Sequence, residues 1–284
     1  MYSTLQALLM QSRGTVSGLF RLRDPYWGRT KHNQPYLRIR LEDSSTNIYA
    51  YSWQPDIYDN QNIIDLCCAE LKGIIRWYAD KKVIDISGIH VTQDKPIDDA
   101  VRLIPQGICP QPWLLAHLQG AVAKITIPPL QKFVAAVLGD DGIGFAFVSC
   151  PASLNHHHNY PGGLLMHSLD CFKMVEKHHN FPKIDYELGL VAALLHDIGK
   201  TLTMTHNMER TSIGASIEHD KLTFEVLGPF LRQLAREWPD GATQLRYLLN
   251  WKLRRNIPRY NMADLVACCD RMSTGLEMEK RMAS

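Results

Sequence analysis

The stretch from Asn155 to Lys200 constrains this chain most, because it places ionisable side chains within strongly apolar helical sequence. It opens with NHHHNYPGGLLMHSLD, which contains His167, and closes with LVAALLHDIGK, in which His196 and Asp197 follow an apolar run. Neighbouring residues on a helix diverge by about 100°, so this imidazole and this carboxylate cannot both enter one core. A helix end can present both to a cleft, and we therefore expect His167, His196 and Asp197 to converge on one site.

A fourth donor is expected from the carboxylates near the end of the chain. Asp270 follows an apolar half-turn in LVACCD, whereas Asp264 lies near a helix start and reads as a surface residue that complements the helix dipole. We prefer Asp270. Imidazoles and carboxylates without a thiolate suit Mn²⁺, Fe²⁺, Co²⁺, Ni²⁺, Zn²⁺ or, less well, Mg²⁺.

This pattern resembles the H…HD…D signature of the HD-domain metal-dependent phosphohydrolases, with His167, His196, Asp197 and Asp270 at the signature positions. More narrowly, PASLNHHHNYPGGLLMH and LLHDIGK resemble the YhaM-type 3′→5′ exoribonucleases, in which an OB-fold precedes the HD domain. The resemblance implies that these four residues bind a divalent metal ion, with Mn²⁺ the first expectation.

Phosphodiester hydrolysis needs such an ion, because it lowers the pKa of a bound water from near 16 toward roughly 7 and polarises a phosphoryl oxygen. We expect catalytic roles for Asp197, for Lys200, four positions after His196, and for His219. In two-metal members of the superfamily, His219 matches the first of the additional histidines. Where a following His pair would stand, this chain has Asn250–Trp251, so we expect one ion per chain.

The first third of the chain reads as strands, most clearly where apolar and polar residues alternate in Pro35–Glu42. Five short strands, with a short helix at Asn62–Cys68 before the fourth, match a closed barrel of OB type. The other four strands are expected at Thr15–Arg23, Asn47–Trp53, Leu71–Ala79 and Lys82–Val91.

The polar face of Pro35–Glu42 is the expected binding face for a nucleic acid strand, since stacking on an aromatic ring contributes about 1–3 kcal/mol per base. Trp77 shares a face with Leu71 and Ile75 and is expected to pack in the core or at an end of the barrel. The expected nucleic-acid contacts are Tyr36, Arg38, Arg40, Trp27, His158, Arg254 and Arg255.

Residues 93–111 contain three prolines and little periodicity, so we expect them to link an OB-fold domain, 1–92, to an all-α HD domain, 112–284. Residues 139–153 are expected to be an irregular connector. Helices are expected at Pro112–Lys124, Pro128–Leu138, Pro161–His179, Asp185–Thr201, Ile213–Trp238, Thr243–Lys252 and Met262–Met278.

Composition places the chain among ordinary globular proteins, with 45% apolar residues, 21% charged residues and a net charge of +2 over 284 residues. Seven cysteines without a CxxC motif indicate reduced thiols rather than a thiolate zinc site. No apolar run approaches the ~18 residues that span a bilayer, and no signal peptide is recognised. We expect a cytoplasmic protein with no membrane partner, and the sequence leaves its oligomeric state open.

Together these features predict a metal-dependent 3′→5′ exonuclease that hydrolyses single-stranded RNA, with single-stranded DNA as a further substrate. Two alternatives remain open. One is a nucleotide phosphohydrolase, against which the OB portion counts because a mononucleotide needs no strand-tracking groove. The other is a non-catalytic nucleic-acid-binding accessory, because HHHNYPGGLLMH also resembles the HD-type region of some mobile-element relaxases.

Overall fold

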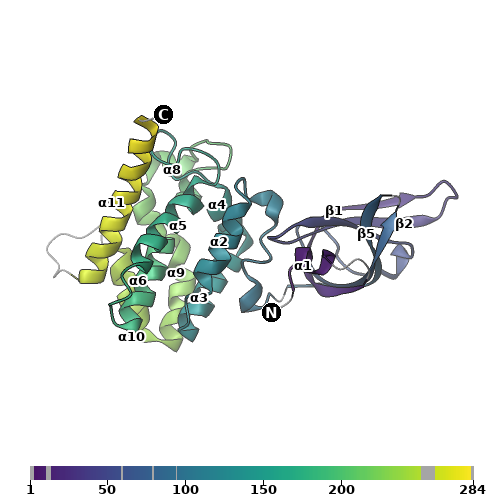
Figure 1. The fold of residues 1–284 in the computed structure, drawn as a ribbon, viewed down its shortest axis with the longest axis horizontal. Helices are drawn as coiled ribbons and strands as arrows, with labels where there is room; N and C mark the ends of the chain where they lie inside the picture. The colour runs from purple at the N-terminus through teal and green to yellow at the C-terminus, as the bar shows by residue number, and fades with distance from the viewer. Residues whose placement is uncertain are drawn as a thin grey trace. The chain divides into compact units, whose positions relative to one another are not determined.

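The computed structural model describes residues 3–10, 14–58, 60–78, 80–93, 95–250 and 260–282. It divides into two compact units, Met1–Gly107 and Ile108–Ser284. The first is a strand barrel that carries a short helix, α1 (Leu5–Leu9), and the second is helical (Figure 1). The predicted fold class, a β-barrel of OB type followed by an all-α domain, is confirmed.

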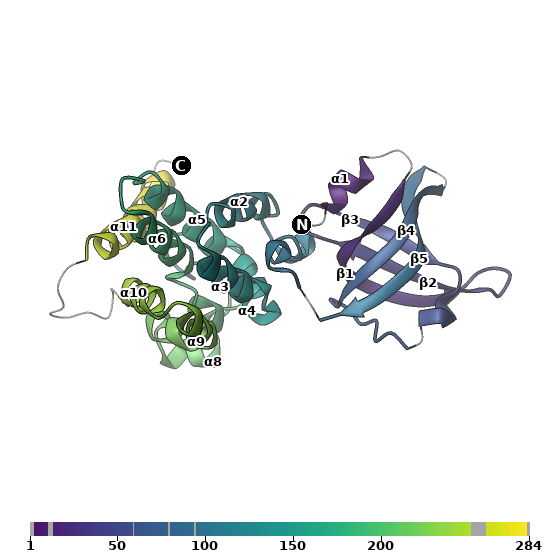
Figure 2. The ribbon, with the colours of Figure 1, turned by 90° about the horizontal axis from the view of Figure 1, so that it is seen from below.

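The barrel closes in the order β1-β2-β3-β5-β4 (Figure 2). The β3–β5 pair is parallel and the other pairs are antiparallel. β1 is longer than expected because, beyond an irregularity between Arg23 and Tyr26, it continues to pair with β2. The strands are β1 (Thr15–Arg29), β2 (Pro35–Glu42), β3 (Asn47–Ser52), β4 (Cys68–Tyr78) and β5 (Lys81–Thr92).

The alternation read from the sequence sets the barrel interior. Leu37, Ile39 and Leu41 of β2 are fully buried, whereas the intervening residues lie on the outer surface. Phe20 and Ile84 join them in one apolar cluster. Because the side-chain period of a strand is two, the outer positions of β2 and β3 are free to form a binding face.

The expected short helix at Asn62–Cys68 is wrong. Leu66 takes a left-handed conformation, φ 66°, which a continuing helix excludes. Its N–H donates to the carbonyl oxygen of Leu22, and the Leu22 N–H donates to that of Cys67. The backbone hydrogen bonds of this segment therefore go to β1, and Cys68 begins β4.

The helical unit departs from the sequence expectation at three places. Residues 139–153 contain a helix, α4, whose N-terminus is capped by Asp140 accepting from the Ile143 N–H. The expected helix at Ile213–Trp238 is two helices, and the expected helix at Asp185–Thr201 ends at Leu195. The helices are α2 (Trp113–Val122), α3 (Pro128–Gly139), α4 (Asp141–Ser149), α5 (Gly163–Glu176), α6 (Lys183–Leu195), α7 (Lys200–Thr203), α8 (Ser212–Ser216), α9 (His219–Glu237), α10 (Pro239–Leu249) and α11 (Asn261–Met282).

Much of the expected linker at 93–111 packs on the barrel. The Leu103 carbonyl accepts a hydrogen bond from Arg21 Nε, and the Gly107 N–H donates to the Glu42 carboxylate at 2.6 Å. Arg102 is 1% exposed, and its guanidinium lies 2.7 Å from an Asp99 oxygen and 3.8 Å from an Asp43 oxygen. The first unit therefore extends to Gly107.

Replacing Arg102 with Ala should lower the free energy of unfolding of the barrel by about 3–5 kcal/mol, because two buried carboxylates lose their cation. Urea unfolding of the full chain measures this. Arg76→Ala is the matched control, since Arg76 is 62% exposed in its pair with Asp85 and should cost less than about 1 kcal/mol. Equal costs for the two substitutions would show that Arg102 does not hold this segment.

Candidate metal centre

His167 is placed by the tight turn that starts α5. Gly162 adopts φ 81°, a left-handed conformation that favours glycine. A Cβ on Gly163 would lie 2.0 Å from the His158 carbonyl oxygen, so only glycine permits this approach. His167 follows one turn later, fully buried, on the face of α5 that packs against α6 and α11.

The His196–Asp197 doublet lies just beyond the end of α6 rather than inside a helix. His196 is the C-terminal cap of α6, and its Nδ1 lies 3.0 Å from the Ala193 carbonyl oxygen. A carbonyl oxygen only accepts, so Nδ1 carries the proton and Nε2 presents its lone pair to the interior. His196 and Asp197 are 3% and 1% exposed.

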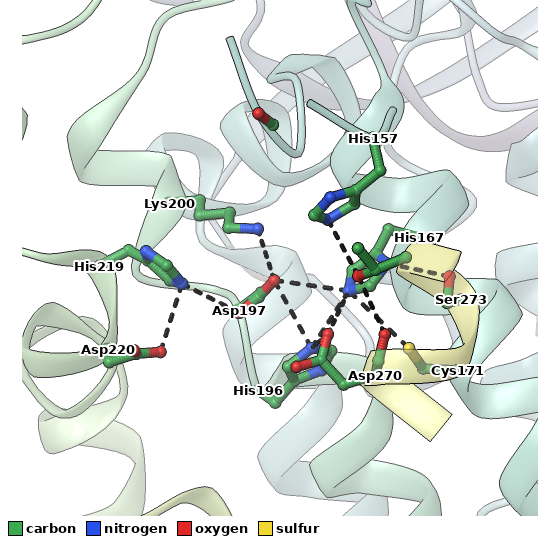
Figure 3. Close-up of polar contacts among 12 residues, drawn as sticks. His157, His167, Cys171, His196, Asp197, Lys200, His219, Asp220, Asp270 and Ser273 are labelled. Atoms are coloured by element: carbon green, nitrogen blue, oxygen red, sulfur yellow. Dashed lines mark hydrogen bonds and ion pairs between the residues drawn. The ribbon is translucent and has the colours of Figure 1, made fainter. Parts of the chain in front are cut away.

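Asp270 enters the same point from α11 (Figure 3). Its Oδ1 lies 3.1 Å from His167 Nε2 and 3.4 Å from His196 Nε2, and the two Nε2 atoms are 3.3 Å apart. Asp197 Oδ2 lies 3.5 Å from each of them. The structure thus brings together the four residues expected as metal ligands.

This geometry fits a divalent cation. Burial lowers the pKa of His167, although hydrogen bonding to Asp270 opposes the shift. Neutral imidazoles and ionised carboxylates that face one another repel, and a cation between them removes the repulsion. These four residues would hold the ion.

Asp197 also contacts a second group of polar side chains, beside the four expected metal ligands. Its Oδ2 lies 2.6 Å from Lys200 Nζ, and its Oδ1 lies 3.3 Å from His219 Nε2. His219 Nε2 is also 3.3 Å from Asp220 Oδ1, so Asp197, His219 and Asp220 form a further set of donors. Sequence reasoning missed Asp220, although its position next to His219 at the start of α9 was the available signal.

A cavity of about 390 Å³ opens beside this group. Lys200, His219 and His157 line it, whereas His158 is 2% exposed and its Nδ1 lies 3.0 Å from the Tyr160 hydroxyl. Burial is the main cause that lowers the pKa of His157 to about 4, and the nearby Lys200 and His167 lower it further. His156 and the neutral His157, rather than the expected His158, are therefore the histidines of the HHH string that line the cavity.

The barrel carries a separate aromatic cleft of about 660 Å³. Tyr51 and Trp53 stack with ring centroids 6.0 Å apart and planes 10° from parallel, and Tyr36 lies 6.4 Å and 6.0 Å from them. Arg29 and Arg76 also line the cleft. Sequence reasoning missed Tyr51 and Trp53, which the alternation in Asn47–Trp53 could have indicated.

The other expected nucleic-acid residues are placed as follows. Arg38 lies over the rings of Tyr26 and Tyr49, and Arg40 forms an ion pair with Asp24 at 2.8 Å. Trp27 pairs in register with Leu37 and does not line the cleft. Arg254 and Arg255 lie outside the described residues.

The expectation that Trp77 packs in the core or at an end of the barrel is wrong. The side chain is 56% exposed and lines the cleft, with Lys82 Nζ 5.4 Å from its ring centroid. Trp77 lies near the end of β4, beyond the buried Leu71 and Ile75, where the apolar alternation no longer faces the barrel interior.

No helix in the described part of the chain combines the length and the apolar character that crossing a bilayer requires.

Comparison with known proteins agrees with this geometry. Residues 164–268 match the family model of the HD domain. The 3′-5′ exoribonuclease YhaM of Oceanobacillus iheyensis is 23% identical over 227 residues, which cover 78% of this chain and 70% of the relative. The 3′-5′ exoribonuclease YhaM of Listeria innocua is 22% identical over 244 residues, covering 83% of this chain and 76% of the relative. A chain of a replication protein A heterotrimer bound to ssDNA covers 28% of this chain and 59% of its own length, with 14% identity and a TM-score of 0.24, too low to carry an argument.

Residues 164–268 therefore match an HD domain, which a barrel of OB type precedes in the chain. The HD domain and the two relatives support a hydrolase. Within this class, the resemblance to the YhaM-type exoribonucleases is confirmed over most of the chain. A metal-dependent nuclease is the activity that the HD domain and these relatives support.

Replacing Gly199 with Ala should destabilise the helical unit by about 1–3 kcal/mol and displace His219. The new Cβ would lie 2.1 Å from the His219 carbonyl oxygen and 2.7 Å from the Thr223 backbone nitrogen. Urea unfolding and nuclease activity measure the two effects. Gly120→Ala in α2 is the control, because a Cβ at this position would meet nothing within 4 Å. This substitution should raise the free energy of unfolding by roughly 0.5–1 kcal/mol. Similar behaviour of the two variants would contradict a close approach of α9 to the doublet.

Proposed function

We propose that this protein is a 3′→5′ exonuclease that hydrolyses the phosphodiester bonds of single-stranded RNA, with single-stranded DNA as a further substrate. One observation carries the proposal. Two imidazole nitrogens lie 3.3 Å apart, and one oxygen of each of two carboxylates lies 3.1–3.5 Å from both, beside a cavity lined by Lys200, His157 and His219. The names of the two relatives support the reaction direction and the RNA substrate.

The residues at the cavity edge have distinct proposed roles. Asp197 holds Lys200 by an ion pair and would share the metal ion, so it links the ion to the cation that faces the phosphate. His219, 29% exposed and in contact with Asp197, would contact the phosphate or the attacking water. The neutral His157 can donate or accept a single hydrogen bond to the substrate.

A bound divalent ion would supply a more acidic water and positive charge beside the phosphoryl oxygens. We propose one ion per chain at His167, His196, Asp197 and Asp270, with Mn²⁺ as the first choice for a set of two imidazoles and two carboxylates. Asp197, His219 and Asp220 offer only three donors, and Asp197 is shared with the first group.

The barrel would bind the strand that the metal centre cleaves. Stacked rings such as Tyr51 and Trp53 accept any base, because every base has an aromatic face, and neighbouring arginines contact the phosphates. Such a cleft supports a polymeric substrate rather than a mononucleotide, which distinguishes an exonuclease from a nucleotide phosphohydrolase.

The direct test uses single-stranded RNA and DNA labelled at either end, incubated with the protein and Mn²⁺. A 3′→5′ exonuclease shortens a 5′-labelled strand stepwise and releases a labelled mononucleotide from a 3′-labelled strand at once. Cleavage of nucleoside triphosphates without strand shortening would instead identify a nucleotide phosphohydrolase.

Replacing Asp197 with Ala should abolish strand shortening while leaving strand affinity within about twofold, because the barrel supplies most of the contacts. Gel assays and fluorescence anisotropy measure the two quantities. Asp264→Ala is the matched control, an exposed carboxylate on α11 that should change neither. Parallel loss of affinity and activity in a folded Asp197→Ala protein would refute the separation of binding from cleavage.

Replacing Trp53 with Ala should weaken binding to single-stranded RNA by about 1–3 kcal/mol, equally for different sequences. Fluorescence anisotropy with strands of different base composition measures this loss. Trp113→Ala serves as control, since Trp113 is 51% exposed in the helical unit and does not line the cleft. Wild-type affinity of the Trp53→Ala protein would show that the strand binds elsewhere.

A further inference from the structure

A cysteine thiol lies within the donor group, where the sequence indicated a site without sulfur. Cys171 follows His167 by four residues on α5, so both side chains project from the same face. The Cys171 side chain is fully buried, and its Sγ lies 3.8 Å from His167 Nε2 (Figure 3). Its sulfur and the donor atoms of His167, His196 and Asp270 all lie within 4.8 Å of one another.

These separations are close to those of a tetrahedral metal site. With metal–nitrogen bonds of about 2.0–2.1 Å and a metal–sulfur bond of about 2.3 Å, ligand nitrogens lie about 3.3 Å apart and sulfur about 3.6 Å from nitrogen. The observed values are 3.3 Å between the two Nε2 atoms, 3.1 and 3.4 Å from them to Asp270 Oδ1, and 3.8 Å from Cys171 Sγ to His167 Nε2. The distance from the sulfur to His167 Nε2 therefore agrees, within a few tenths of an ångström, with that between two ligands of one ion.

Two other buried thiols of the helical unit behave differently. Cys109 and Cys150 each turn their sulfur to a backbone carbonyl oxygen at 3.2 Å, the oxygens of Gln111 and Met204, as expected for small core residues with a weak donor. Cys171 instead turns its sulfur toward a ring nitrogen that already faces a carboxylate. Packing alone needs only a small apolar side chain at this position, so the placement of the sulfur points to coordination.

We propose that Cys171 Sγ is an additional ligand of the ion, and that it shifts the preference of the site away from the Mn²⁺ expected for the imidazoles and carboxylates alone, toward ions that bind sulfur, Zn²⁺, Fe²⁺ and Co²⁺. This inference rests on the metal site of the proposed function and extends its ligand set. Thiolate is a soft donor, whereas Mn²⁺ and Mg²⁺ favour oxygen, so one sulfur changes the relative affinities. On binding, the thiol gives its proton to solvent and the sulfur lone pair goes to the ion.

The test loads metal-free protein with Co²⁺ and records its absorption spectrum, because cobalt bound to thiolate has a charge-transfer band in the near ultraviolet. The band should appear in the wild type and in Cys109→Ala, and be absent from Cys171→Val and Cys171→Ser. Cys109→Ala is the matched control, since it removes a buried thiol that bonds to the backbone. Cys171→Ser keeps a small polar side chain, so it decides the question if the valine variant fails to fold.

Competition titrations give a second readout. Relative to the wild type, Cys171→Val should bind Zn²⁺ at least about tenfold more weakly, with Mn²⁺ affinity changed much less. An identical spectrum in wild type and Cys171→Val, or an unchanged ratio of Zn²⁺ to Mn²⁺ affinity, would overturn the proposal. Such a result leaves the exonuclease untouched, because strand shortening with Mn²⁺ is measured separately. A cobalt band in a protein that shortens no strand would instead support the ligand and refute the proposed function.

Discussion

The mutual repulsion of donor atoms at one buried point is the constraint on which the helical unit depends. His167 Nε2, His196 Nε2 and Asp270 Oδ1 approach one another to 3.1–3.4 Å, and the two histidines are almost fully buried. Hydrogen bonds elsewhere on the rings fix this orientation, because His196 Nδ1 is held by the Ala193 carbonyl and His167 Nδ1 by the Ser273 hydroxyl. A cation is the simplest way to make this arrangement favourable, and folding and metal binding should therefore be coupled in this unit.

Close backbone contacts between the surrounding helices allow these donor atoms to approach one another. Glycines at the start of α5 and after the doublet allow backbone contacts that a Cβ would block, with the His158 carbonyl in one case and the His219 carbonyl in the other. Thr223 Oγ1 lies 3.2 Å from the His196 carbonyl oxygen and 3.3 Å from that of His219, which joins the doublet to α9. Asp197 can then contact Lys200 and His219 at once, so metal binding and phosphate contact share one carboxylate.

The sequence predicted the parts of this protein that depend on local pattern. Alternation in Pro35–Glu42 predicted the bounds of β2, and the apolar run before His196 predicted a helix, although that helix ends at Leu195 instead of at the expected Thr201. Residues that meet only through tertiary packing were harder to predict. The backbone of the segment at Asn62–Cys68 forms hydrogen bonds with β1 instead of forming a helix. The local sequence does not identify a hydrogen-bond partner that lies more than 40 residues away along the chain. Cys171 resembles any small core residue in the sequence, and only the approach of α6 and α11 places its sulfur among ligands.

The proposed function requires an ion at the four converging residues. X-ray diffraction from crystals of the metal-loaded protein, recorded at the absorption edge of the ion, locates this ion. We predict one anomalous peak per chain, about 2.0–2.2 Å from His167 Nε2 and His196 Nε2 and within coordination distance of the Asp197 and Asp270 carboxylates. A second peak, roughly 3.5–4 Å away between Asp197, His219 and Asp220, would contradict the single ion. The absence of any peak at the four residues would contradict the central claim.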